Sequence, residues 1–356
     1  MIVPTKTPID MLTGGLFHGR VTLIYGPTGC GKTTLALAIS KGLLEAGRDK
    51  LNKVIYIDTE EGVPESLDDG KIEVKHAYSL KEQKELLKEL SKSDLNKVAV
   101  IVDTLTGHFH REVLRAPAQF RAGVAGDLSG RLIDQLSLLR KIVGQGKGVG
   151  LVTAHLRSPV SDAFKLNVLR KMAKAYKDGK YLPSATDYER YMAYDPVRWI
   201  GGQGLGMHTQ YRFRIYVDED RSRIIQVEKW PAYPVIPNWC IRYRVTEDGG
   251  FEVVGQRFTM DIQTKSRLFS LEFKTILGEV LEVSEKEGIE VEEAEKHEEK
   301  DVERKKLKSR KPRPGDVKLP TVPSLKDVVE KEKSRGGGKT DESNNSSPSG
   351  EGDRNR

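Results

Sequence analysis

Residues 21–33 read VTLIYGPTGCGKT, in which an apolar, β-branched run precedes the spacing G-x-x-x-x-G-K-[ST]. The following stretch, Leu35–Leu44, is rich in leucine and alanine and predicts a helix. A strand, a glycine-rich turn and a helix in this order form a phosphate-binding loop, because backbone amides and the helix N-terminus converge on an anion. The expected nucleotide-binding residues are Gly26, Pro27, Thr28, Gly29, Cys30, Gly31, Lys32, Thr33 and Thr34.

The loop and two later carboxylates predict ATP and Mg²⁺ as ligands. Lys32 is expected to neutralise the β- and γ-phosphates, and the Thr33 hydroxyl is expected to ligate Mg²⁺. Asp103 ends an apolar run and is expected to hold the magnesium shell. Glu60 follows another apolar run and is expected to orient and deprotonate the attacking water. Its neighbour Glu61 has the same chemistry, and these residues alone do not separate the two.

Further apolar runs predict a layered α/β domain. Val54–Ile57, Val98–Val102 and Val149–Thr153 are continuous and β-branched, as strands buried on both faces of a parallel sheet are. Between them, Ser79–Glu82 has the pattern of a capping box, which predicts the start of a helix. A later stripe at helical spacing consists of Leu132, Leu136, Leu139 and Val143. The alternation favours a mainly parallel, twisted sheet flanked by helices.

The second half of the chain changes character three times. Residues 156–206 are rich in lysine, arginine and tyrosine, and a connection of this length is usually functional or disordered. Residues 211–256 return to strand-like runs and predict antiparallel strands at the C-terminal edge of the sheet. After one expected helix, too few apolar side chains remain to offset the entropy of ordering. The expected organisation is a core at 1–260 that includes the 156–206 extended basic insertion, a helix at 261–283 and a disordered tail at 284–356.

Composition limits the class of protein. The net charge is +7, and residues 281–356 are nearly balanced, so the first 280 residues hold the excess. A basic body attracts nucleic acid or another polyanion, although ordinary solubilising charge gives the same balance. The sequence has no apolar run long enough for a membrane span and no leader-like start, so neither a membrane span nor a secretory signal is expected. With only Cys30 and Cys240, no disulfide framework is expected, and we expect a reduced, cytoplasmic protein.

Several segments beyond the phosphate loop resemble the RecA/RadA recombinase family, over residues 7–255. The resemblance lies in Thr7–Ser40, Ile57–Glu60, Asp127–Arg131, Asp195–Pro196 and Ile200–Gly202. It implies a RecA-like core that uses ATP and Mg²⁺, and it favours Glu60 over Glu61 as the catalytic carboxylate. A chain that starts at the core, with no helix-hairpin-helix region before it, is similar to RadB and related archaeal paralogues rather than to RadA itself.

The resemblance also implies two DNA-binding loops. The first follows the Asp103 strand, at about 108–126, and its expected contacts are Arg111, Arg115 and Arg121. The second spans 156–206, and its expected phosphate contacts are Arg157, Lys165, Arg170, Lys171, Lys174, Lys177 and Lys180. Tyrosines of the second loop, among them Tyr188, can stack on the bases of single-stranded DNA. A solvated, charged helix over Phe164–Lys180 with core tyrosines is the alternative interpretation.

The chain departs from the family pattern in ways that bear on mechanism. The family places a glutamine after its fourth strand to sense the γ-phosphate, and this chain has His155 there, whose charge depends on pH. The Arg-x-x-Arg that follows the catalytic glutamate in RadA is not found in Glu60–Ser66, so adenine stacking is expected to differ. The RadA-type Phe-x-x-Ala tether is not found either, so filament formation by this chain alone is not expected. Lys229 is a candidate to reach a neighbouring subunit's γ-phosphate.

These resemblances imply an ATPase of the RadA-paralogue type that binds DNA, single-stranded DNA in particular, and assists homologous recombination and repair. Hydrolysis is expected to be slow and DNA-dependent unless a neighbouring subunit completes the site. The implied partners are DNA and a RadA-type recombinase or a second copy of the chain. A KaiC-like regulatory ATPase, which shares the core and acts on protein partners without binding DNA, is the alternative from another class.

Overall fold

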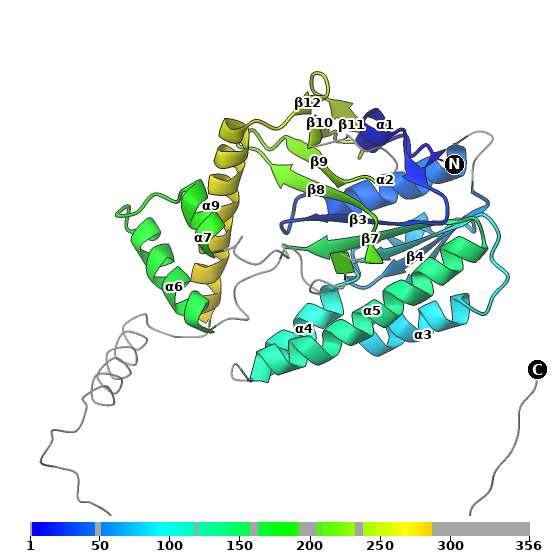
Figure 1. The fold of residues 1–356 in the computed structure, drawn as a ribbon, viewed down its shortest axis with the longest axis horizontal. Coiled ribbons are helices and arrows are strands. Elements are labelled where there is room, and N and C mark those ends of the chain that lie inside the picture. The colour runs from blue at the N-terminus through cyan, green and yellow to red at the C-terminus, as the bar shows by residue number, and fades with distance from the viewer. Residues whose placement is uncertain are drawn as a thin grey trace, which may run out of the picture. The chain divides into compact units, whose positions relative to one another are not determined.

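A computed structural model describes most of the first 286 residues of the chain (Figure 1). The described ranges are 2–46, 51–117, 120–156, 163–191, 205–206, 208–231 and 238–286. The chain divides into two units, Met1–Glu295 and Lys296–Arg356, and every described residue belongs to the first. None of the helices in the described ranges is long and apolar enough to cross a membrane.

One large sheet has the strand order β11-β10-β9-β8-β3-β7-β6-β4-β5, with β12 beside β10. The parallel strands are β3 (Val21–Gly26), β4 (Lys53–Asp58), β5 (Ile72–His76), β6 (Val98–Asp103), β7 (Val149–His155) and β8 (Tyr211–Val217). The antiparallel strands are β9 (Arg223–Lys229), β10 (Trp239–Val245), β11 (Phe251–Val253) and β12 (Phe258–Thr259). The expected α/β class, a mainly parallel sheet with antiparallel strands at its C-terminal edge, is confirmed.

Strand direction determines which residues meet at the carboxyl edge of the parallel strands. β3, β4, β6 and β7 end there, at Gly26, Asp58, Asp103 and His155. The register pairs Gly26 with His155 and Asp58 with Asp103, so each pair lies level across neighbouring strands. β9 runs in the opposite direction to β8, so its first residue, Arg223, lies at the same edge. Segments far apart in the sequence therefore meet along one side of the sheet.

One face of the sheet is covered by the helix that follows the phosphate loop. This layer contains α1 (Pro8–Thr13), α2 (Lys32–Glu45) and a small antiparallel pair of β1 (Ile2–Val3) and β2 (Leu16–Phe17). Gly42 lies where the N-terminal segment crosses α2, and a Cβ there would be 1.6 Å from the Thr5 carbonyl oxygen. Only glycine therefore allows the two backbones to approach this closely.

Three helices pack against the opposite face (Figure 1). They are α3 (Leu80–Leu90), α4 (Gly107–Arg115) and α5 (Arg121–Gln145). The predicted cap begins α3, because the Ser79 hydroxyl accepts a hydrogen bond from the Glu82 amide at 3.1 Å. The predicted leucine stripe lies on α5 and is fully buried. The segment expected as the first DNA loop, 108–126, therefore contains α4 and the start of α5 in its described part.

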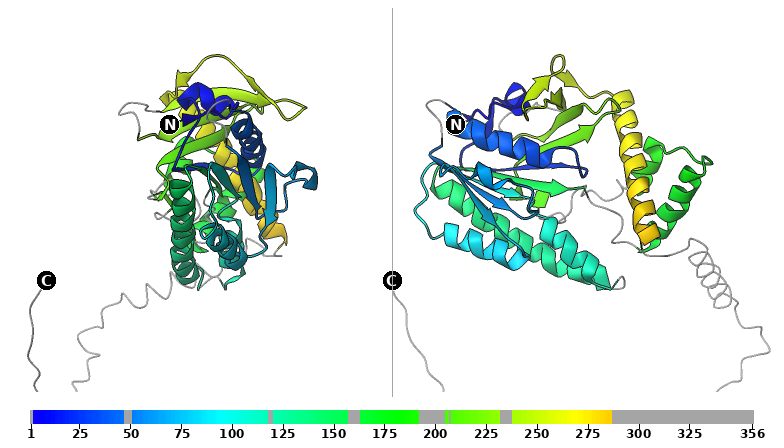
Figure 2. Two further views of the ribbon diagram at one scale, coloured as in Figure 1. Left: turned by 90° about the vertical axis from the view of Figure 1, so that its right-hand side faces the viewer. Right: turned by 180° about the vertical axis from the view of Figure 1, so that it is seen from behind.

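A separate helical layer packs beside β8 (Figure 2). It consists of α6 (Ala163–Lys177), α7 (Ala185–Tyr191) and α9 (Ile262–Lys286). Tyr188 is buried in this layer and stacks on Phe269 with ring centroids 4.5 Å apart. The segment expected as an extended loop, 156–206, thus contains two packed helices in its described part. α9 extends the predicted helix to Lys286, and the rest of the expected tail lies outside the described residues.

Candidate nucleotide-binding site

Backbone geometry between β3 and α2 depends on glycine. Gly29 and Gly31 have φ angles of 73° and 90°, in the left-handed region that side chains disfavour. At Gly26 a Cβ would lie 2.7 Å from both the Cys30 Sγ and the Ile215 carbonyl oxygen, so the neighbouring β8 leaves no room for a side chain. α2 begins directly after this turn, at Lys32. A glycine-rich turn that leads into a helix N-terminus is the backbone geometry of an anion site.

Lys32 is buried, and its ammonium lies within the loop. The Nζ atom donates to the Gly26 carbonyl at 3.2 Å and to the Pro27 carbonyl at 2.9 Å. These carbonyls offset part of the desolvation of a buried cation. Phosphate oxygens carry a full negative charge, and charge-assisted hydrogen bonds are stronger than those to neutral carbonyls. Thr33 and Thr34 follow in the first turn of α2 and are partly exposed.

Asp103 is buried at the end of β6 with both carboxylate oxygens engaged. The Tyr56 hydroxyl donates to Oδ2 at 2.7 Å, and the Thr153 hydroxyl donates to Oδ1. Burial, and then the charge of Asp103, raise the pKa of Tyr56 well above its usual value, so the phenol remains a donor. Neutral donors orient the carboxylate without cancelling its charge, which suits it to the hydration shell of a divalent cation.

The donor chemistry of Thr33 and Asp103 fits the expected Mg²⁺. Magnesium takes oxygen ligands, keeps several waters and is commonly bound by one or two protein groups together with substrate phosphates. Within the described ranges, no group of three or more histidine, cysteine or acidic residues is arranged to hold a metal ion alone. A magnesium site here would combine Thr33 and Asp103 with the phosphates of a nucleotide.

Glu60 lies just beyond β4, where two side chains from neighbouring strand ends hold it. Its Oε1 atom accepts a hydrogen bond from the Thr104 hydroxyl at 3.1 Å and lies 2.8 Å from the His155 Nε2. The hydrogen bond from His155 is the largest cause that lowers the pKa of Glu60 to about 2, and burial opposes it. The carboxylate is therefore ionised at neutral pH but is a weak base in this arrangement. Glu60 and Glu61 are both exposed, so the contacts with Thr104 and His155, and not burial, mark Glu60.

Two of the arginines expected to bind DNA in the first loop make structural contacts. The Arg111 Nη2 atom donates to the Thr59 carbonyl at 2.7 Å and lies 2.9 Å from the His108 Nδ1, so it ties α4 to the end of β4. Arg121 donates from Nε to the Ala116 carbonyl at 3.1 Å and also contacts the Leu114 carbonyl, which places it at the C-terminus of α4. Arg115 is exposed in the last turn of α4.

The basic residues expected in the second loop divide into buried and exposed sets. Arg170 is buried, and its Nε atom donates to the Ser284 hydroxyl of α9 at 3.1 Å. Lys171 is partly buried on the same helix. The exposed members are Lys174, Lys177 and Lys180, of which Lys180 lies 3.3 Å from Asp178. Lys165 lies on α6, but its side chain and the whole of Arg157 lie outside the described part.

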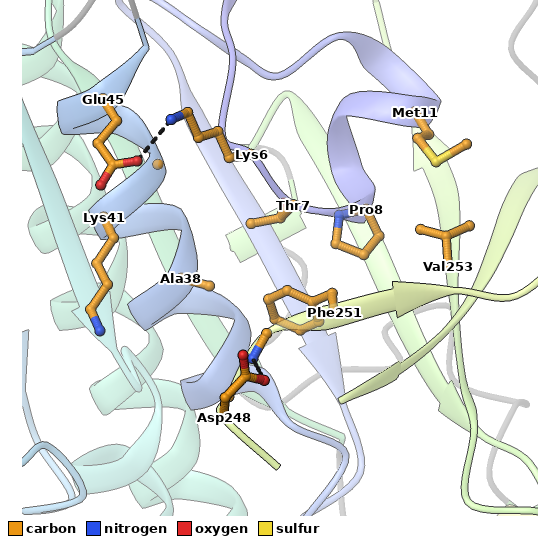
Figure 3. A pocket seen from close by; sticks show the side chains of 13 residues that line it. Lys6, Thr7, Pro8, Met11, Ala38, Lys41, Glu45, Asp248, Phe251 and Val253 are labelled. Carbon is orange, nitrogen blue, oxygen red and sulfur yellow. Dashed lines mark hydrogen bonds and ion pairs between the residues drawn. The ribbon is translucent and has the colours of Figure 1, made fainter. Parts of the chain in front are cut away.

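A groove of about 510 Å³ lies between α1, α2 and the turn that joins β10 to β11 (Figure 3). Pro8, Met11 and Phe251 give it apolar walls, and a Lys6–Glu45 ion pair of 2.8 Å lies beside it. None of the predicted nucleotide-binding or catalytic residues lines this groove. The residues predicted to bind the nucleotide lie instead at the carboxyl edge of the sheet.

Curated relatives with similar sequences share one name, DNA repair and recombination protein RadB. The protein from Thermococcus kodakarensis is 35% identical over 152 residues, which cover 38% of this chain and 63% of that protein. The protein from Archaeoglobus fulgidus is 33% identical over 154 residues, which cover 40% of this chain and 66% of that protein. A protein from Methanosphaera stadtmanae is 44% identical over 64 residues, or 18% of this chain and 26% of that protein.

These similarities cover only part of each protein, and the chain spans less than two thirds of the length of the relatives it matches. No protein-family model matches the chain. The mainly parallel sheet, the glycine-dependent loop and the matched segments nevertheless agree with one another. Over the core that these matches cover, the chain belongs to the RecA/RadA superfamily and is RadB-like.

Proposed function

We propose that this protein is an ATP-binding, magnesium-dependent ATPase of the RadA-paralogue type that binds DNA and assists homologous recombination and repair. The main support is the convergence of three features at one edge of the sheet: the glycine-dependent loop with Lys32, the oriented carboxylate of Asp103, and the hydrogen-bonded pair of Glu60 and His155. Each has a distinct part in phosphoryl transfer, which depends on positioning and charge stabilisation.

The residues of this site divide the work of hydrolysis. Loop amides and the Lys32 ammonium would bind the phosphates, and Thr33 and Asp103 would hold the metal, which would supply charge stabilisation at the phosphate oxygens. Glu60 accepts a hydrogen bond from the attacking water and orients it. The His155 Nε2 lies 2.8 Å from the Glu60 Oε1. If a γ-phosphate accepts the hydrogen bond from Nε2 instead, the Glu60 carboxylate loses this donor and is free to bind the attacking water. This competition makes His155 the γ-phosphate sensor of the proposed reaction.

The DNA part of the proposal rests on exposed positive charge and on the names of the relatives. The RadB proteins are named for DNA repair and recombination. On this chain, Arg115 is exposed on α4, and Lys174, Lys177 and Lys180 are exposed on or just after α6. Such side chains bind the phosphate backbone and release counterions, so affinity for single-stranded DNA should fall steeply with added salt. A RadA-type recombinase or a second copy of the chain is the proposed protein partner.

Nucleotide binding tests the first part of the proposal. Lys32→Ala should abolish measurable ATP binding in equilibrium titrations, because the buried ammonium is lost from the loop. Lys41→Ala is the matched control, since Lys41 lies on the same helix and is exposed. Equal ATP affinity in Lys32→Ala and in the control would refute the assignment of the site.

Stimulation of hydrolysis tests the connection to DNA. We expect the ATPase rate of the full chain to rise when single-stranded DNA is added, and the DNA affinity to rise with ATP. The double variant Lys174→Ala/Lys180→Ala should weaken DNA binding and flatten its salt dependence, because each lost phosphate contact removes released counterions. A rate that DNA does not change, together with no measurable DNA binding, would leave only the ATPase part of the proposal.

A KaiC-like regulatory ATPase that acts on proteins is the second candidate. It is favoured by one observation, which is that the described part of the expected second DNA loop is packed into helices and that its Arg170 is buried against Ser284. A helix fixed in this way offers fewer side chains to DNA than an extended loop does. The DNA-binding titration separates the candidates, because this second function requires ATP binding without any DNA affinity.

A further inference from the structure

Arg223 is a residue outside the phosphate-loop sequence that nevertheless contacts the loop. It is the first residue of β9, whose antiparallel direction brings its start to the edge where β3 ends. Across the neighbouring strands it lies opposite Val217 of β8 and Tyr243 of β10. Its Nε atom donates to the Cys30 carbonyl oxygen at 3.0 Å, a contact that joins residues 193 positions apart.

Gly31 and Arg223 are fitted closely together. A Cβ on Gly31 would lie 3.0 Å from the Arg223 Nε and 3.7 Å from its Cζ, so the guanidinium lies against the glycine where a side chain would otherwise be. Gly31 also has a φ of 90°, which side chains disfavour. The last glycine of the motif therefore provides both the backbone turn and the space that the arginine occupies.

The contact fixes the orientation of one peptide unit. In a trans peptide the carbonyl and the following N–H point in opposite directions, and the Cys30 carbonyl belongs to the same unit as the Gly31 amide. When Arg223 holds the oxygen on its own side, the Gly31 N–H must point to the other side, away from Arg223. Inward-pointing amides are the groups that bind phosphate in such loops.

Lys32 fixes different atoms of the same loop. Its ammonium binds the carbonyls of Gly26 and Pro27, at the start of the turn, whereas Arg223 binds the carbonyl of Cys30, near its end. The two cations thus orient carbonyl groups at both ends of the turn. Only Arg223 does so from a separate strand, so its contact also fixes the loop relative to the antiparallel part of the sheet.

We propose that Arg223 is a positioning residue of the nucleotide site, which acts by holding the Cys30–Gly31 peptide with its amide toward the bound phosphates. The inference rests on the proposed function of this loop in ATP binding. It assigns Arg223 no contact with the nucleotide. The hydrogen bond from Nε, and not the charge of the guanidinium, is the property that the site requires.

Three substitutions separate the hydrogen bond from the charge. Arg223→Gln places an amide nitrogen at the same number of bonds from the backbone as Nε, so it keeps the donor and removes the charge. Arg223→Met has a similar length and removes both. Arg223→Lys keeps the charge but puts its nitrogen one bond farther from the backbone. Arg244→Met is the matched control, because Arg244 is an exposed arginine on the adjacent β10 that pairs with Asp220 at 3.0 Å.

The test is equilibrium binding of magnesium ATP to the full chain and to each variant. We expect Arg223→Met to weaken binding about tenfold, the effect of losing one hydrogen bond that orients a phosphate donor. Arg223→Gln should remain within about threefold of the unsubstituted chain, and Arg244→Met should not differ from it. Thermal unfolding without nucleotide identifies any variant that fails to fold. If Arg223→Met does not fold, the ATP affinities of Arg223→Gln and Arg223→Lys still separate the effect of the donor position from the effect of the charge.

Each outcome has a definite meaning. Unchanged affinity in Arg223→Met, while Lys32→Ala abolishes binding, overturns this inference and leaves the proposed function intact. Loss in Arg223→Gln as large as in Arg223→Met, with Arg223→Lys unaffected, also overturns it, because charge and not position is then what matters. Unchanged ATP affinity in Lys32→Ala is the separate result that removes the proposed function itself. ATP affinity that is retained in Arg223→Gln but lost in Arg223→Met and Arg223→Lys supports the positioning role.

Discussion

Breaking the ion pair between Arg214 of β8 and Glu272 of α9 should strongly destabilise the folded protein. The Arg214 side chain is 0% exposed and that of Glu272 3% exposed, and Nη2 lies 2.5 Å from Oε2. The same Nη2 atom donates to the Tyr188 hydroxyl of α7 at 2.8 Å, so one guanidinium connects the sheet to two helices. Burial lowers the pKa of Arg214, but the charge of Glu272 and the nearby tyrosines raise it above its usual value, so the residue stays charged. Removal of the carboxylate therefore leaves a buried cation.

The magnitude follows from what remains around that cation. Removing one partner of a buried pair typically costs about 3–5 kcal/mol. In Glu272→Leu the guanidinium keeps the Tyr188 hydroxyl and the faces of Tyr216 and Phe269, whose ring centroids lie 4.4 and 5.3 Å from Cζ. Cation–π contacts with desolvated rings are worth about 1–2 kcal/mol, which favours the lower end of the range. We expect a loss of about 3 kcal/mol, or about 6–12 °C in melting temperature.

Denaturant unfolding, followed by circular dichroism, measures this change, and a double variant tests its cause. Arg214→Met/Glu272→Leu replaces both charges with apolar side chains of similar volume, so it should recover most of the stability that Glu272→Leu loses. Two results would refute the reasoning. One is a loss below about 1 kcal/mol in Glu272→Leu, the value of an exposed pair. The other is a double variant at least as unstable as the single one.

Three further perturbations have defined outcomes. Ser79→Ala should lower the free energy of unfolding by about 1 kcal/mol, because α3 loses its N-cap acceptor; an unchanged denaturation midpoint would contradict this. Gly42→Ala should destabilise by about 3 kcal/mol or prevent folding, since its Cβ meets the Thr5 carbonyl; wild-type stability by the same assay would exclude the close approach. His155→Ala should raise the pKa of Glu60 from about 2 toward its usual value, as measured by carboxyl-carbon NMR. A depressed pKa stabilises the fold above the unfolded value, 4.5, and that contribution is lost as pH falls toward 2. The variant should therefore be less stable than the unsubstituted chain above pH 4.5, and the difference should vanish as pH falls toward 2.

Strands of the core and the phosphate loop could be predicted because their signals are local. β3, β6 and β7 are buried along almost their whole length, so each is a continuous apolar run that a polar or glycine residue ends. That ending also identified Asp103, since the first carboxylate after such a run lies at the carboxyl edge. β5 was not predicted, because it lies at the edge of the sheet and has a partly exposed pattern without a continuous apolar run.

Contacts between distant segments could not be predicted from local patterns. Among the basic residues of α6, charge alone does not distinguish Arg170, whose partner Ser284 is 114 positions away, from the exposed Lys174. Arg111 likewise resembled a DNA contact in the sequence, whereas its guanidinium binds the Thr59 carbonyl. In each case a long basic side chain joins two elements of the fold. Only the packed structure shows which basic side chains have this role. The DNA-binding roles of these residues remain predictions.

Arg223 shows that a residue at the start of a strand, and not only one at its end, can be predicted to lie beside the phosphate loop. Parallel strands present their last residues at the edge where the phosphate loop lies, so the residues after apolar runs were the natural candidates. An antiparallel strand in the same sheet presents its first residue at that edge instead, and β9 begins with an arginine. The sequence predicts antiparallel strands over 211–256 but does not show which of them lies beside β3, and that pairing decides which end of β9 reaches the loop. Once the antiparallel arrangement of 211–256 is expected, a cation at the start of its second strand becomes a candidate neighbour of the loop on the same physical grounds as Asp103 at the end of β6.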